Sequence, residues 1–330
     1  MTSKKRIFVL YTGGTIGMSQ SPQGLRPDTA LVGTALAPFS DGLEFDWHVC
    51  NPLIDSSAVT LQNWCDWLDL LAAKIPHYDG ILVLHGTDTM AYTANILALA
   101  LPGLDKPVVL TGSQWPFDSK GSDAPLNLAT AVAALETADL REVAIAFNGA
   151  LFPAVGSSKS STETAAGFSN PHFGMLGEWS AAQGWQGLAL RPSEKARALV
   201  KQSLNPQAKV VCHTLTPGFS AEALSTGLGN IAADAVILQS YGHGNAPADA
   251  AFISAVKAFT GKGGLVLNIS QVPQGCAAAV YAQGDALRQA GVINGGKANL
   301  ETAVALLTLA VSAGWQAEQV RACLTRLQLV

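Results

Sequence analysis

Short segments that are apolar at almost every position recur along the first half of the chain, with longer segments rich in alanine and leucine between them. Strands with this pattern are typically buried on both faces, as in a parallel sheet, whereas strands with one exposed face alternate apolar and polar residues. The strands predicted in this way are Ile7–Leu10, Gly80–Leu84, Pro107–Leu110 and Val143–Phe147. The helices predicted between them are Leu61–Ala73, Ala91–Leu99 and Leu126–Ala138. This alternation indicates a doubly wound α/β fold, with ligand-binding loops at the carboxyl ends of its strands.

The alternation is interrupted between about Ser157 and Gly187, where serine, glycine and aromatic residues are frequent. A polar segment with two prolines follows, and similar elements then resume. The resumed elements are predicted at Lys209–His213, Ala235–Gln239 and Gly264–Asn268 (strands) and at Ala248–Thr260 and Leu300–Ala313 (helices). We therefore expect two domains: a larger N-terminal catalytic α/β domain with a mostly parallel sheet and a smaller C-terminal α/β domain. The expected ranges are 1–190 and 209–330, with a linker over 191–208.

The composition and charge of the chain argue against several classes of function. The 330 residues correspond to about two domains at roughly 150 residues each. Hydrophobic residues make up 48% of the chain and charged residues only 13%, a balance that excludes disorder and favours surface buried in an oligomer. The net charge of -4, and aromatic residues that do not interleave with basic ones, argue against binding to nucleic acid or to anionic membranes.

The chain carries no sequence signal for membrane insertion or for a zinc site. No apolar run approaches the roughly 18 residues of a membrane span, and the apolar stretch Ile7–Tyr11 is too short for the core of a signal peptide. We therefore expect a cytoplasmic protein. The five cysteines include no CxxC pair, which favours reduced and mostly buried thiols, and the six histidines have no spacing typical of zinc ligands.

Dense polar clusters mark four loops of the predicted α/β fold. These clusters are Thr12–Gly17, His85–Thr89, Thr111–Gln114 and Gly156–Ser160. Because loops that follow adjacent parallel strands meet at one edge of a sheet, we expect the clusters to converge on one pocket.

Three of these clusters also have a purely structural interpretation. Gly13 and Gly14 form either a tight turn into a helix or a backbone that passes close to a ligand. Asp88 is a candidate N-cap of the following helix, whose free N–H groups would also suit a carboxylate ligand. Lys159 is either a solvated loop residue or a buried base. Burial would favour its neutral amine, whereas a nearby Asp88 would favour the charged ammonium.

Motifs for several other chemistries are missing or incomplete. The chain has no GxSxG sequence, and its GGxxG turn does not match the GxGxxG pattern of dinucleotide-binding proteins. Gly291–Ala298 resembles a phosphate-binding loop, but Ala298 stands where a serine or threonine must reach magnesium. We treat this segment as a chance match.

Taken together, the polar clusters resemble those of the bacterial-type L-asparaginase (asparaginase/glutaminase) family, and the resemblance extends along the whole chain. The matching segments are Tyr11–Gly17, Asp55–Ser57, Leu84–Met90, Leu110–Gln114, Ser122–Asp123 with Asn127–Leu128, Lys159, and Ser240–Pro247. The sequences TGGTI and HGTDT are specific to the family when they occur together in this order. The form of the last block and the lack of a signal peptide look closest to the cytoplasmic type I members.

The resemblance implies hydrolysis of asparagine to aspartate and ammonia, with no metal or cofactor. Thr12 matches the nucleophile of the family, and Thr87, Asp88 and Lys159 match a hydrogen-bonded triad. A threonine hydroxyl is a weak nucleophile until a neighbouring group accepts its proton. The Lys159–Thr87 pair is suited to protonate the departing ammonia, and backbone N–H groups around Gly86 and Thr87 are suited to stabilise the oxyanion.

The resemblance also implies how substrate would be held. Ser56, with Ser57 beside it, matches the serine that binds the α-carboxylate of the substrate. Asp88 matches the residue that holds the α-ammonium group, and Ser113 falls where a backbone group faces the departing amide. The α-carboxylate and the α-ammonium group of an amino acid are attached to the same carbon. A site that selects an amino acid therefore needs a hydroxyl for the first group next to a carboxylate for the second.

One departure from the family concerns the mobile lid that follows the first motif. Family members usually carry a tyrosine near the nucleophile there, whereas Leu25, within Gln23–Pro27, takes that position in this chain. Tyr11 is the only tyrosine before Tyr78, so a small shift in the alignment does not supply one. We therefore expect Thr12 to be activated without a phenol at that position, and turnover or affinity to be weaker than usual.

Three functions are consistent with these residues. The first is a cytoplasmic L-asparaginase that works through a threonine nucleophile and an acyl-enzyme. The second is a glutaminase or a hydrolase of another small amide. The third is a sensor that binds asparagine or aspartate with little turnover, a function that Leu25 keeps open. The resemblance further implies a homodimer or homotetramer with sites near the subunit interface.

Overall fold

The computed structural model describes residues 4–330 except 22–23, 28, 192–197, 231 and 279–281, and the side chains of residues 20–29 and 279–284 also lie outside this description. The chain forms two compact units, residues 1–201 and 202–330. The finer division into 1–190, a linker over 191–208 and 209–330 stays a prediction.

The first unit is built on an eight-stranded sheet whose strand order is β12-β11-β8-β7-β6-β5-β1-β4. Its parallel strands are β4 (Leu43–Val49), β1 (Lys5–Tyr11), β5 (Gly80–Leu84), β6 (Val108–Thr111) and β7 (Val143–Phe147). Antiparallel strands extend it beyond β7, namely β8 (Ala150–Pro153), β11 (Gly177–Ser180) and β12 (Gly184–Gln186). The last two strands lie in the segment where the apolar pattern is interrupted.

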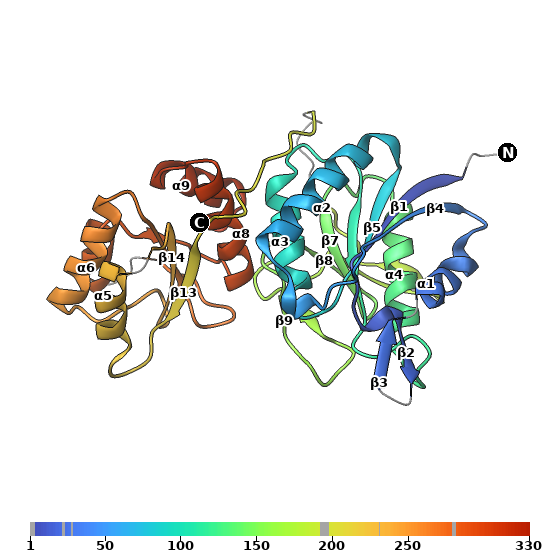
Figure 1. Ribbon diagram of the computed structural model, residues 1–330, viewed down its shortest axis with the longest axis horizontal. Coiled ribbons are helices and arrows are strands. Elements are labelled where there is room, and N and C mark those ends of the chain that lie inside the picture. Colours follow the sequence, from blue (N-terminus) through green and yellow to red (C-terminus); the bar gives the residue numbers. More distant parts are fainter. Residues whose placement is uncertain (1–3, 22–23, 28, 192–197, 231, 279–281) are drawn as a thin grey trace. The chain divides into compact units, whose positions relative to one another are not determined.

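The strands predicted from continuous apolar runs are confirmed, with shifts of one or two residues at their ends. Every residue of β5, β6 and β7 is buried, because helices cover both faces of the sheet. Figure 1 shows the helices that cover each face. They are α2 (Leu61–Lys74) and α3 (Met90–Ala100) on one, and α1 (Thr29–Leu36) and α4 (Ala124–Glu136) on the other. The doubly wound, mostly parallel α/β fold is therefore confirmed.

The order of the parallel strands defines where a ligand would bind. The chain passes from β1 to β4 on one side of β1, then returns to β5 on its other side. Such a reversal is the topological switch point of an open α/β sheet, and ligands bind outside the carboxyl ends of the strands there. The switch point lies between β1 and β5, which the Thr12–Gly17 and His85–Thr89 clusters follow.

Two small hairpins stand outside the main sheet. The first joins β2 (Met18–Ser21) to β3 (Gly24–Pro27) directly after the first polar cluster. The second pairs β9 (Ser158–Lys159) with β10 (Phe168–Ser169) and carries Lys159 opposite Phe168. Short 3-10 helices occupy several turns, at Thr15–Gly17, Ala37–Phe39, Ser56–Ala58 and Ile75–His77.

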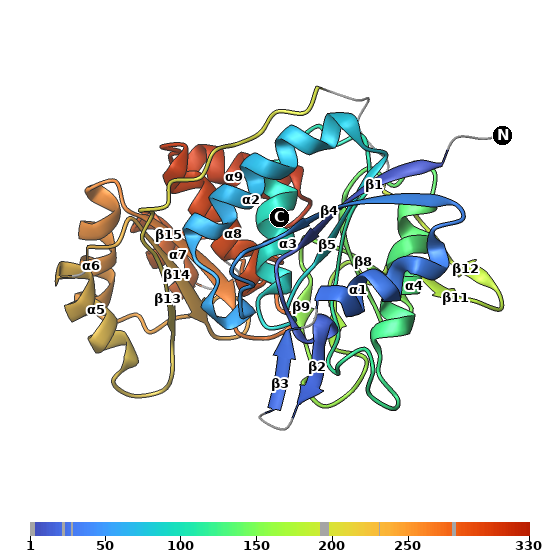
Figure 2. The same ribbon diagram turned by 45° about the vertical axis from the view of Figure 1, so that its right-hand side comes forward.

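The second unit has a four-stranded, entirely parallel sheet of order β13-β14-β15-β16. These strands are β13 (Val210–Thr214), β14 (Ala235–Ser240), β15 (Leu265–Ser270) and β16 (Ile293–Asn294). Its helices are α5 (Ser220–Asn230), α6 (Ala250–Gly261), α7 (Ala282–Gln289), α8 (Leu300–Ser312) and α9 (Ala317–Arg326). Figure 2 shows α5 and α6 on one face of this sheet and α8 on the other. The block Ser240–Pro247 begins at the last residue of β14, and Tyr241 and Asn245 close a tight turn there through a main-chain bridge.

Two further expectations can be compared with the structure. The thiols are free, but only Cys323 is buried and Cys212 is exposed, so the expectation of mostly buried cysteines is wrong. Within the described ranges, every helix is too short or too polar to cross a bilayer.

Candidate active site

Thr12 is fixed at the junction of the two strands that flank the switch point. Its N–H donates to the carbonyl of Leu84, the last residue of β5, at 3.0 Å. Its side-chain hydroxyl donates to the same carbonyl at 3.1 Å, and only 2% of the residue is exposed. The hydroxyl proton of Thr12 therefore points at the backbone of β5.

Glycines let three turns pack backbone against backbone around Thr12. Gly13 and Gly14 have φ angles of 131° and 103°, which other residues rarely adopt. A Cβ on Gly13 would lie 2.3 Å from the carbonyl oxygen of Ile54, and one on Gly14 would lie 2.6 Å from the amide nitrogen of Gly86. A Cβ on Gly86 would lie 2.5 Å from Oγ of Ser56. The glycine pair thus forms a tight turn into a 3-10 helix. Its backbone packs closely against other backbone segments of the protein.

Lys159, Thr87 and Asp88 form one hydrogen-bonded group beyond the end of β5. Nζ of Lys159 donates to Oγ1 of Thr87 at 2.8 Å and lies 2.7 Å from Oδ1 of Asp88. The Lys159 side chain is 17% exposed, whereas the carboxylate of Asp88 is 60% exposed. Lys159 is therefore neither a solvated loop lysine nor an isolated buried amine, because a carboxylate and a hydroxyl both accept from it.

The expectation that Asp88 caps the following helix is wrong. Helix α3 begins at Met90, its N-cap is Thr89, and no side chain caps it. Thr89 instead donates its hydroxyl to the carbonyl of Ser56 at 2.7 Å. Because Asp88 lies one residue too early to cap the helix, its carboxylate is left to pair with Lys159.

Ser56 and Ser57 begin the short 3-10 helix that packs against Gly86. Asp55 caps this helix, and its Oδ1 accepts from both the N–H and the hydroxyl of Ser57, at 2.9 and 3.0 Å. Ser56 is only 5% exposed and touches Gly86, whereas Ser57 is exposed. The structure thus brings Ser56 to the same edge as Thr12 and Thr87, with Ser57 on the outside.

The loop after β6 brings Ser113 against the loop after β5. A Cβ on Gly112 would lie 2.2 Å from the carbonyl oxygen of His85 and 3.7 Å from Cγ2 of Thr87. Ser113 is 1% exposed, and its hydroxyl donates to the carbonyl of Trp115 at 2.6 Å. Its side chain is therefore engaged within its own loop.

A buried carboxylate holds this loop in place. Asp123 is 6% exposed, and its two oxygens accept from the N–H of Gln114 at 3.0–3.1 Å and from that of Trp115 at 3.1 Å. Asn127 donates to Asp123 and to the carbonyl of Gly112, both at 2.9 Å. The sequence by itself assigned no role to Gln114 or Asp123, although both stand in the matching segments.

His85 is a buried neutral imidazole that orients the Gly86 carbonyl. Burial lowers its pKa to about 4, so the ring is neutral at pH 7 and has one donor and one acceptor nitrogen. Nδ1 faces the carbonyl of Gly86 at 2.7 Å and must carry the proton, and Nε2 accepts from the hydroxyl of Thr93, which itself accepts from Trp64. Since the C=O and N–H of a trans peptide point in opposite directions, the N–H that follows Gly86 points away from His85.

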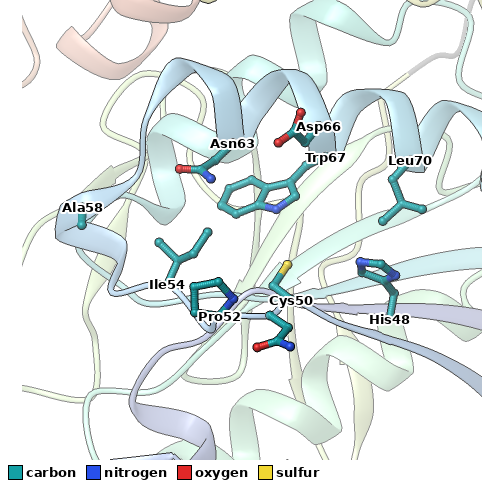
Figure 3. A pocket seen from close by; sticks show the side chains of 10 residues that line it. His48, Cys50, Pro52, Ile54, Ala58, Asn63, Asp66, Trp67 and Leu70 are labelled. Carbon is teal, nitrogen blue, oxygen red and sulfur yellow. The ribbon is translucent and has the colours of Figure 1, made fainter.

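A separate pocket of about 470 Å³ lies beside the Asp55–Ser57 turn, and the residues on either side of that turn, Ile54 and Ala58, line it (Figure 3). It lies between α2 and the segment after β4, and Figure 3 shows Trp67 and Asp66 across from Cys50. Its lining residues are His48, Cys50, Asn51, Pro52, Ile54, Ala58, Asn63, Asp66, Trp67 and Leu70. None of the predicted site residues lines it, so it is distinct from the candidate active site.

The position of the Leu25 side chain and the presence of metal ligands can be judged only from the residues that the structure describes. Leu25 pairs with Gln20 through the backbone of the β2–β3 hairpin, but its side chain lies outside the description, so its relation to Thr12 stays a prediction. Among the described residues, no three or more histidine, cysteine, aspartate or glutamate side chains are grouped as metal ligands.

The sequence matches two family models. The model "Asparaginase, N-terminal" matches residues 6–187, and "Glutaminase/Asparaginase C-terminal domain" matches residues 209–324. The chain is 34% identical to L-asparaginase 1 of Escherichia coli (strain K12), over 98% of this chain and 96% of that protein.

Solved structures agree with these matches. The L-asparaginase I structure from Vibrio cholerae superposes with a TM-score of 0.85 at 33% identity, over 98% of this chain and 97% of that one. A probable cytoplasmic L-asparaginase from Campylobacter jejuni superposes with a TM-score of 0.80 at 26% identity, over 98% of this chain and 99% of that one. The family models, the relatives and the solved structures with the same fold show that the chain belongs to the asparaginase family of amidohydrolases.

Proposed function

We propose that this chain hydrolyses L-asparagine to aspartate and ammonia, with Thr12 as the nucleophile and an acyl-enzyme as the intermediate. The observation that carries the proposal is the hydrogen-bonded group of Lys159, Thr87 and Asp88 beyond the end of β5, the strand to which Thr12 is bonded. Membership in the asparaginase family, and the names of the relatives from Escherichia coli and Vibrio cholerae, support asparagine as the substrate.

In the first step, the hydroxyl oxygen of Thr12 attacks the side-chain amide carbon of asparagine. This hydroxyl donates to the carbonyl of Leu84, which is too weak a base to take the proton. The hydroxyl must therefore turn away from Leu84 and lose its proton to a side chain or water. The resulting oxyanion is stabilised by the N–H groups of Gly86 and Thr87, and one such donor is worth about 3 kcal/mol.

In the second step, the carbon–nitrogen bond breaks and the nitrogen leaves as ammonia. The leaving nitrogen needs a proton, and Lys159 reaches Thr87 at 2.8 Å to form a donor path. Water then attacks the ester carbon on Thr12, which releases aspartate and restores the hydroxyl. Thr12 is therefore regenerated in each turnover.

Substrate recognition is assigned to groups around the same edge. The hydroxyl of Ser56, with Ser57 beside it, binds the α-carboxylate, and the carboxylate of Asp88 binds the α-ammonium group. Asp88 is 60% exposed and has a second oxygen beside the one that faces Lys159, which leaves it able to bind a cation. A backbone group of Ser113 faces the departing amide.

The test is ammonia release by the purified enzyme with L-asparagine or L-glutamine as substrate. We expect a higher kcat/KM for asparagine by roughly 10–200-fold, because one extra methylene in a tight pocket costs about 1–3 kcal/mol. A higher value for glutamine would favour the second candidate, a glutaminase. That candidate is supported by the matching C-terminal model, whose name includes both activities.

A sensor with little turnover is the remaining alternative. The orientation of the Thr12 hydroxyl toward Leu84 favours it, because a nucleophile held by the backbone is not poised to react. Saturable binding of asparagine in calorimetry, together with negligible ammonia release, would support this function and contradict hydrolysis.

We also propose a cytoplasmic location, assembly as a homodimer or homotetramer with sites near the subunit interface, and a linker over residues 191–208. The location is supported by the similar protein from Campylobacter jejuni, which is described as a probable cytoplasmic L-asparaginase. The assembly is supported by the charged fraction of only 13%, which is low for a chain whose whole surface faces water.

A further inference from the structure

Gln114 links the loop that carries Thr87 to the segment that follows Lys159. Its Oε1 lies 3.5 Å from Oγ1 of Thr87. Its Nε2 donates to the carbonyls of Ser161 at 2.8 Å and Thr164 at 3.3 Å. Ser161 lies two residues after Lys159 in the chain. One half-buried carboxamide therefore contacts Thr87 and the segment that supports Lys159.

The two carbonyl acceptors determine which way the carboxamide of Gln114 faces. Carbonyl oxygens only accept, so the NH2 group must face them and Oε1 is turned toward Thr87. The ammonium of Lys159 only donates, so the oxygen of Thr87 accepts from it and the Thr87 proton needs another acceptor. Oε1 of Gln114 can accept it. At 3.5 Å the contact is long, as is common for catalytic hydrogen bonds before substrate binds.

Both ends of Gln114 are held by the surrounding structure. Its backbone N–H donates to the buried carboxylate of Asp123 at 3.0–3.1 Å. At the other end, a Cβ on Gly167 would lie only 3.0 Å from Nε2 of Gln114. The carbonyl of Gly167 accepts from the N–H groups of Ser160 and Ser161, so the hairpin that carries Lys159 packs directly on the carboxamide.

We propose that Gln114 is a positioning residue that sets the hydrogen bond between Lys159 and Thr87. It does so by anchoring the Lys159 hairpin through two carbonyls and, before substrate binds, by accepting the Thr87 proton, so that the Thr87 oxygen faces the ammonium of Lys159. This inference rests on the proposed hydrolysis, because Thr87 and Lys159 supply the proton for the leaving group there. Gln114 acts through these two residues and does not itself contact the reacting atoms.

The test compares wild-type enzyme with Gln114→Met and Gln114→Glu in steady-state ammonia release from asparagine, with melting temperatures measured in parallel. Methionine has a similar length but no polar atoms, and a glutamate carboxylate cannot donate to the two carbonyls. We expect kcat to fall by roughly ten- to a hundredfold in both variants, with KM changed less than about threefold, because small misplacements of catalytic groups act on the chemical step. Gln62→Met is the matched control, since Gln62 lies on the surface of α2 and donates to Asp66 of the same helix.

Three results would overturn the proposal. The first is full kcat in the two Gln114 variants. The second is a loss of kcat seen only in variants that also melt early, because Gln114 would then have a structural role alone. The third is a rise in KM without a fall in kcat, because Gln114 would then belong to the binding of substrate. A wild-type enzyme that releases no ammonia would show instead that the proposed function fails, and the inference would fall with it.

Discussion

Replacement of Lys159 is expected to lower catalytic activity strongly while changing the stability of the fold little. Its ion pair with Asp88 involves a carboxylate that is 60% exposed, and pairs of this kind contribute at most about 1 kcal/mol to folding. Its bond to Thr87, in contrast, lies on the proposed path of the proton to the leaving group. We therefore expect Lys159→Met to lower kcat by roughly 10²–10⁴-fold while the free energy of unfolding changes by about 1 kcal/mol or less. Ammonia assays and urea unfolding measure the two quantities, and an active Lys159→Met enzyme would contradict the role assigned to the amine.

His85 gives the protein a specific dependence of stability on pH. Burial lowers its pKa from 6.5 to about 4 in the folded state, whereas the unfolded chain keeps the ordinary value. Between these two values the unfolded chain binds a proton that the folded chain does not. The stability associated with His85 is therefore present above pH 6.5 and is lost as pH falls toward 4, by about 3 kcal/mol in all.

The variant His85→Gln checks this pH dependence, because glutamine does not titrate. We expect the wild-type free energy of unfolding to fall more steeply than that of the variant between pH 6.5 and 4. Urea denaturation of both proteins at several pH values provides the comparison. Parallel curves would show that His85 titrates normally in the folded protein.

At the scale of the elements, the turn after β1 leaves little room for change. A Cβ on Gly14 would lie 2.6 Å from the amide nitrogen of Gly86, and the φ angle of 103° disfavours any other residue. We expect Gly14→Ala to lower the free energy of unfolding by roughly 2–3 kcal/mol and to abolish ammonia release, because the turns around Thr12 and Thr87 must separate. The control is Gly33→Ala in α1, where the new Cβ meets no described atom within 4 Å outside its own stretch of helix, and alanine is the better helix former. A Gly14→Ala protein with wild-type stability and activity would contradict this account of the turn.

The elements also show how far the sequence could predict this structure. Strands β5 and β7 were predicted to the residue, because complete burial leaves an unbroken apolar run. Strand β4 was missed, because it lies at the edge of the sheet and most of its residues are partly or fully exposed. Strand β9 has only two residues and so no pattern to detect, although it carries Lys159.

The candidate site was predictable in part. The residues around the switch point could be found because their loops follow parallel strands, and the resemblance to the family supplied their expected roles. The N-cap expectation for Asp88 is wrong because helix α3 begins at Met90 and its N-cap is Thr89, the residue after Asp88. Gln114 received no role, since its contacts with the Ser161–Thr164 turn depend on the packing of a hairpin far away in the sequence.

At the scale of the whole molecule, the low charge content leads to a prediction about assembly. The chain has 44 charged side chains (20 basic and 24 acidic) among 330 residues, and we propose that part of its surface is covered by other copies. Sedimentation velocity at micromolar concentration should give the mass of a dimer or tetramer. A single monomeric species over that concentration range would contradict the proposed assembly.

We propose above all that asparagine is hydrolysed at the edge of the sheet between β1 and β5, through the hydroxyl of Thr12. The most direct measurement is the rate of ammonia release by Thr12→Ala, with Thr34→Ala as control, since that exposed hydroxyl donates to the carbonyl of Ala30 within α1. We expect wild-type activity for the control and a loss of at least roughly a thousandfold for Thr12→Ala, with a melting temperature only a few degrees lower, because the variant loses one hydrogen bond worth about 1 kcal/mol. Wild-type ammonia release by Thr12→Ala would contradict the account.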